Sequence, residues 1–128
     1  MSILATEKKW TALNKFVQQL RQWAKDQGWN VEEEAYEIGS KDQFIETQRL
    51  EITTNTQAIV RVEPKGIGIL DKTLRVEVVA WPSLNRVTLI GEAKANDWKV
   101  LTDSGINLPD PVNSSQTFSS LVSHLTAS

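Results

Sequence analysis

Two carboxylates and one lysine are the residues of this chain whose types and spacing could support catalysis. Glu92 and Lys94 stand two residues apart at the end of an apolar stretch that is predicted to be a strand, and Glu77 comes fifteen residues before Glu92. A carboxylate and a lysine at the end of a strand can form part of a magnesium-dependent nuclease site. Magnesium is a hard cation that takes oxygen ligands, which carboxylates supply.

The segment VEVVAWPSLNRVTLIGEAKA, residues 76–95, resembles the core hairpin of the PD-(D/E)xK nuclease superfamily. That family places an acid on one strand and Glu-x-Lys on the next. The resemblance implies that Glu77 and Glu92 hold magnesium and that Lys94 orients or activates a water. The chain departs from the family pattern in having Glu after valine where the family usually has Asp after proline. The family also has a helix after the second strand, whereas residues 95–111 are predicted to be strand and loop.

The register of this hairpin decides what the three residues can do together. A loop at residues 82–85 would place Glu77 opposite Ile90 and Arg75 opposite Glu92. Glu77 and Glu92 would then lie diagonally on one face, with Cα atoms about 7–8 Å apart. The same register makes Arg75 and Glu92 an ordinary cross-strand ion pair. In that second interpretation Lys94 only marks the end of the strand and protects it against edge pairing.

The remaining composition excludes several kinds of chemistry. The chain of 128 residues has no cysteine and one histidine, His124, so disulfides, thiolate metal sites and zinc sites are not expected. Neither a dinucleotide-binding glycine motif nor a phosphate-binding loop is present in the sequence. We therefore expect no cofactor and no bound metal, and His124 is expected to lie near the carbonyl end of a terminal helix.

Charge and hydropathy limit the classes of partner. The net charge is −2. Residues 1–31 hold five basic and two acidic residues, for a net charge of +3, and residues 32–51 hold two basic and seven acidic residues, for −5. Such a distribution lacks the broad basic charge pattern of a nucleic-acid-binding protein, so we do not expect nucleic acid as a partner. No stretch approaches the roughly 20 apolar residues of a membrane span, and no secretory signal begins the chain. We expect a cytoplasmic protein that does not contact a membrane.

Periodicity predicts a single α+β domain over residues 1–128, with an N-terminal amphipathic helix, a mostly antiparallel sheet of five or six strands and a C-terminal helix. The first helix is predicted at residues 6–27, with Thr6 as its N-cap and Gly28 as its C′ residue. The last helix is predicted to begin with a capping box of Asn113 and Gln116. Strands are predicted at residues 29–39, with a bulge at the acidic run, and at 44–54, 57–64, 73–81, 86–94 and 97–102.

Five tryptophans are many for a chain of this length. Trp10 and Trp23 fall on the apolar stripe of the first helix and are predicted to be core residues. Trp81 and Trp98 flank the second hairpin and are predicted to be partly exposed, as contacts for a partner, because tryptophan is enriched at binding hot spots.

Two functional hypotheses follow. The first is a non-enzymatic protein-interaction module, such as a small adaptor, chaperone or immunity-type protein, that binds another protein or forms a homodimer. In size and acidity the chain resembles the small chaperones of bacterial secretion systems. The second is a magnesium-dependent nuclease that uses Glu77, Glu92 and Lys94. A small-molecule pocket between sheet and helices is a third possibility that rests on architecture alone.

Overall fold

The computed structural model describes residues 3–40, 43–67, 73–91, 98–101 and 111–126, which form two helices and six strands. The helices are α1 (Ile3–Asp26) and α2 (Ser115–Thr126). The strands are β1 (Asn30–Ser40), β2 (Gln43–Thr53), β3 (Ile59–Ile67), β4 (Leu74–Trp81), β5 (Arg86–Gly91) and β6 (Lys99–Leu101). Neither helix is long and apolar enough to cross a membrane, within the part of the chain that is described.

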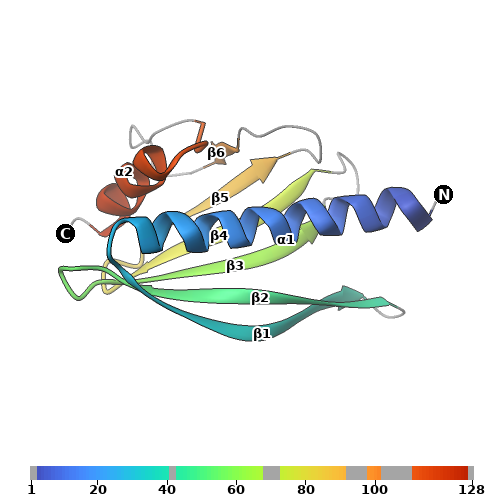
Figure 1. Cartoon of the computed structure of the whole chain (residues 1–128), viewed down its shortest axis with the longest axis horizontal. Coiled ribbons are helices and arrows are strands. Elements are labelled where there is room, and N and C mark those ends of the chain that lie inside the picture. Colours follow the sequence, from blue (N-terminus) through green and yellow to red (C-terminus); the bar gives the residue numbers. More distant parts are fainter. Residues whose placement is uncertain (1–2, 41–42, 68–72, 92–97, 102–110, 127–128) are drawn as a thin grey trace.

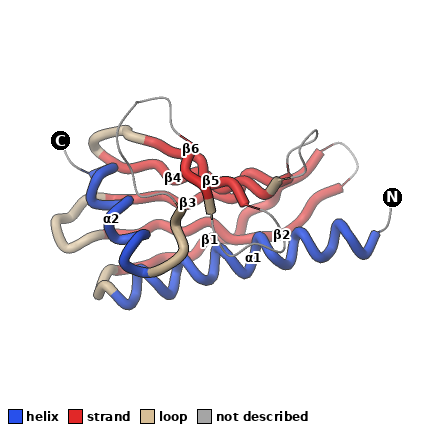
Figure 2. The backbone as a smooth tube through the Cα atoms, turned by 90° about the horizontal axis from the view of Figure 1, so that it is seen from above, coloured by secondary structure: helices blue, strands red, loops and turns tan. Residues whose placement is uncertain are grey.

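The six strands form one antiparallel sheet in the order β1-β2-β3-β4-β5-β6, so each strand pairs with its neighbours in the sequence (Figure 1). Both helices pack on the same face, because their buried side chains belong to one core cluster with the inward side chains of the strands (Figure 2). The predicted α+β class, with a terminal helix at each end and an antiparallel sheet between them, is confirmed.

The spacing of apolar residues explains why residues 3–26 form helix α1. Leu13, Val17 and Leu20 lie at helical spacing and are fully buried against the sheet. Gly28 is the C′ residue, as predicted, with a φ of 79°. The helix end is a Schellman motif, because the Trp29 N–H donates to the carbonyl of Ala24 and the Gly28 N–H to that of Lys25. The predicted start at Thr6 is wrong, because the helix already begins at Ile3 and Thr6 lies inside it.

The core is formed by alternate residues of the strands. In β4 the side chains of Leu74, Val76, Val78 and Ala80 are fully buried, while Arg75 and Glu77 between them are half-buried on the other face. This alternation places hydrophobic side chains under the helices and polar ones on the opposite face. The same pattern continues in β3 and β5.

The first hairpin is regular, which corrects the prediction of a bulge at the acidic run. β1 and β2 pair without a register shift from Asn30 opposite Thr53 to Ser40 opposite Gln43. The irregularity is in β3 instead, where the register with β4 shifts between Pro64 and Gly66. Proline has no N–H to donate to a ladder, so a bulge beside it is expected.

The β4–β5 hairpin is two residues out of the predicted register. Glu77 pairs with Thr88 rather than Ile90, and Arg75 pairs with Ile90. The register differs because the loop lies at residues 81–84 instead of 82–85. The hydrogen bond from the Ala80 N–H to the Asn85 carbonyl closes the loop there.

Helix α2 is capped by residues one position later than predicted. Ser114 and Thr117 exchange hydrogen bonds, since the Ser114 Oγ accepts from the Thr117 N–H and the Thr117 Oγ1 accepts from the Ser114 N–H. This is a capping box in which a threonine hydroxyl replaces the predicted Gln116 carboxamide. At the other end of the helix, the exposed His124 ring nitrogen Nδ1 lies 2.7 Å from the carbonyl oxygen of Ser120.

Candidate interaction surface

No described element covers the face of the sheet opposite the helices. This face is formed by the outward residues of the strands, which stand in rows across the sheet. One row contains Glu32, Glu51, Arg61, Val79 and Arg86, in which each residue pairs with the next across neighbouring strands. The row therefore mixes both signs of charge with one apolar side chain.

The charged side chains of this face largely neutralise one another. Arg49 binds the Glu34 carboxylate with two nitrogens, at 2.9 Å and 3.0 Å, and lies 5.5 Å from the centre of the Tyr36 ring. The hydrogen bond and charge of Arg49 hold the pKa of Glu34 below its usual value. Lys65 donates to Glu63 at 3.1 Å. Such exposed pairs fix side-chain positions but contribute little to stability.

At one end of the face, the row of Thr53, Ile59 and Trp81 carries no charge. Trp81 stands directly opposite Ile59 and is 43% exposed, although it is a large aromatic side chain. We call this pair the Trp81 patch (Ile59 and Trp81); Val79, two residues before Trp81 on the same face, is only 8% exposed and adds little to it. The exposure of Trp81 is as predicted, and its role in binding remains a prediction.

Trp98 does not belong to this surface, and the prediction that it is partly exposed is wrong. Its side chain is 4% exposed and stacks on Phe16 of α1, with ring centres 3.6 Å apart and planes 3° apart. The backbone of Gly91 lies against the indole so closely that a Cβ at Gly91 would be 2.6 Å from it. A side chain enclosed in this way is part of the core and cannot contact a partner.

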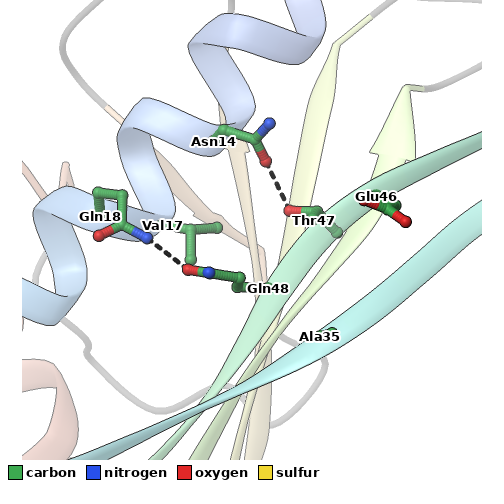
Figure 3. Close-up of a pocket in the computed structure, with 7 residues that line it drawn as sticks. All are labelled: Asn14, Val17, Gln18, Ala35, Glu46, Thr47 and Gln48. Carbon is green, nitrogen blue, oxygen red and sulfur yellow. Dashed lines mark hydrogen bonds between the residues drawn. The ribbon is translucent and has the colours of Figure 1, made fainter.

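A polar groove lies on the other face, between α1 and the β1–β2 hairpin (Figure 3). Its volume is about 390 Å³, and its lining is formed by Asn14, Val17, Gln18, Ala35, Glu46, Thr47 and Gln48. Two hydrogen bonds cross it: Gln18 Nε2 donates to Gln48 Oε1 at 2.7 Å, and Thr47 Oγ1 donates to Asn14 Oδ1 at 2.6 Å. These bonds tie α1 to β2 and engage part of the polar lining. Sequence patterns did not indicate this groove.

The residues of the nuclease hypothesis are only partly described. Glu77 is half-buried on the uncovered face, opposite Thr88, whereas Glu92 and Lys94 lie outside the described residues. The next described element after β5 is the strand β6, which pairs with β5, rather than the helix that the nuclease core has at this point. Among the described residues no three His, Cys, Asp or Glu side chains lie together as a metal-binding group.

No known protein family, curated protein or solved structure matches the chain. Its function is therefore inferred from its own residues.

Proposed function

We propose that the protein is a non-enzymatic interaction module, such as a small adaptor, chaperone or immunity-type protein, which binds a partner protein through the Trp81 patch. The observation that carries this proposal is the 43% exposure of Trp81 on an uncovered sheet face, opposite Ile59. A rigid aromatic side chain on a strand loses little conformational entropy when a partner covers it. Tryptophan is also among the residues that contribute most to binding when a protein partner buries them.

The surroundings of the patch support a protein partner. The neighbouring row of the sheet is charged and includes Arg61 and Arg86. An apolar centre with a polar rim is the usual composition of a protein interface.

Photo-crosslinking in the native cell tests the proposal. A photoreactive benzoylphenylalanine at position 81 should crosslink to a defined partner protein. The matched control is the same group in place of Lys15, which is exposed on α1 and therefore on the helix side of the sheet. We expect one crosslinked species from position 81 that is absent from position 15. Equal crosslinking from both positions, or none from position 81, would contradict the proposed surface.

The nuclease hypothesis predicts that the purified protein cleaves nucleic acid, whereas the proposed function predicts that it does not. Incubation with plasmid DNA and with RNA, in the presence of magnesium or manganese, should give no cleavage. Cleavage that disappears in both Glu92→Gln and Lys94→Ala, with the fold intact, would overturn the assignment as a non-enzymatic module.

A further inference from the structure

β1 is a long strand at an open edge of the sheet. Its eleven residues pair with β2 along their whole length, and no other described element forms backbone hydrogen bonds with it (Figure 1). The opposite edge differs, because β6 has three residues and a further bridge joins Trp98 to Val112 beside it. In an antiparallel pair, alternate residues of an edge strand point their N–H and C=O groups outward, where another strand can pair with them.

The charges of β1 are not fully balanced within the chain. Four glutamates and no basic residue lie on this strand. Glu33 forms an ion pair with Arg21, and Glu34 forms one with Arg49. Glu32 and Glu37 have no ion pair among the described residues, and both are exposed.

Glu32 and Glu37 each stand opposite another acid. Glu32 pairs with Glu51, and Glu37 pairs with Glu46. Like charges directly opposite each other on two strands destabilise the pairing. Arg61, 3.6 Å from Glu51, offsets part of this repulsion beside Glu32, whereas no ion pair among the described residues involves Glu46. A cation arriving from outside the edge beside Glu32 or Glu37 would offset this repulsion, so the strand is complementary to a basic partner rather than to a second copy of itself.

The spacing of these two sites specifies the partner further. Glu32 and Glu37 are five residues apart, which corresponds to roughly 17 Å along a strand at about 3.4 Å per residue. Because five is an odd number, the two side chains lie on opposite faces of the sheet. Glu32 lies on the uncovered face, opposite Glu51, and Glu37 lies on the other face of β1, opposite Glu46, which lines the groove beside α1.

We propose that β1 binds an extended segment of a partner protein as an additional strand, and that this segment carries two Lys or Arg residues five positions apart. Backbone hydrogen bonds along the edge provide the pairing, and the two basic side chains beside Glu32 and Glu37 set its register. This inference rests on the proposed function as an interaction module, but it uses a surface separate from the Trp81 patch.

A synthetic peptide of alternating threonine and valine, with two lysines five positions apart, is the probe. Amide hydrogen exchange of the full chain, followed by NMR, should show slower exchange at alternate residues of β1 when the peptide is added. Glu32→Gln/Glu37→Gln should weaken binding, by at most about fivefold for each exposed ion pair. The control is Asp26→Asn/Glu77→Gln, which removes the same charge from α1 and β4 and should bind as the parent does.

Three outcomes would overturn the inference. The first is equal binding of a backbone N-methylated peptide with the same charges, because that would show attraction by charge without strand pairing. The second is binding without protection of β1 amides. The third is no binding at all, in which case the acids of β1 only keep the edge unpaired. If position 81 still crosslinks to a partner in these cases, the proposed function stands and only the inference about β1 fails.

Discussion

The contact between Gly91 and Trp98 provides the sharpest test of the packing. An alanine at Gly91 would place its Cβ 2.6, 2.7 and 2.8 Å from three atoms of the indole ring, where 3.4–4 Å is ordinary contact. The indole cannot move away, because Phe16 is stacked on it at 3.6 Å and must occupy the opposite face of the ring. We therefore expect Gly91→Ala to cost about 1–3 kcal/mol by overpacking.

Trp98→Ala removes a buried side chain and should cost about 3–5 kcal/mol. If the two substitutions acted independently, the double variant would lose about 4–8 kcal/mol. The structure predicts strong coupling instead, because the shortened side chain at position 98 leaves room for the new Cβ. The double variant should be no less stable than Trp98→Ala alone, which corresponds to a coupling of about 1–3 kcal/mol.

Urea unfolding of the parent, both single variants and the double variant measures this coupling. The control pair is Gly91→Ala with Trp81→Ala, whose effects should add because Trp81 is on the other face of the sheet. Additive effects for Gly91 and Trp98 would refute the packing of the indole on Gly91.

Four further predictions address stability and metal binding. Leu20→Ala should cost about 2–5 kcal/mol, since Leu20 is fully buried, and an unchanged denaturant midpoint would show that α1 does not pack as described. Ser83→Ala should cost about 0.5–1.5 kcal/mol, because the Ser83 Oγ donates to the Leu125 carbonyl at the end of α2; thermal unfolding of the variant checks this. Glu34→Gln should be less stable than the parent at neutral pH. The pKa of Glu34 is lowered from 4.5 by Arg49, so this difference should vanish as the pH falls below 4.5, and urea unfolding at a series of pH values measures it. The melting temperature should be the same with and without EDTA, whereas a sharp drop would support Glu77 and Glu92 as metal ligands.

The fold was predictable because it follows from local patterns. The stripe of α1, the alternation in β4 and the glycine at position 28 each determine their local structure through neighbours in the sequence. The charge run at residues 32–34 was also visible, but its pairing with Arg21 and Arg49 depends on the helix and the second strand.

The errors arose where distant residues decide the structure. The β4–β5 loop was misplaced because Ser83 and Asn85 are held by the Leu125 carbonyl of α2, a contact between residues about 40 positions apart. Trp98 was misassigned because the surfaces that bury it come from α1 and β5. Gly91 was the available signal, since a glycine within a strand often marks the close approach of another group.

The affinity of the crosslinked partner for Trp81→Ala tests the central claim most directly. Isothermal titration should show binding about thirtyfold weaker than that of the parent, as for a hot-spot residue of about 2 kcal/mol. Lys15→Ala is the control, because Lys15 is exposed on α1, on the helix side of the sheet, and its affinity should equal that of the parent. Equal affinities for Trp81→Ala and the parent, with both proteins folded, would contradict binding through the Trp81 patch.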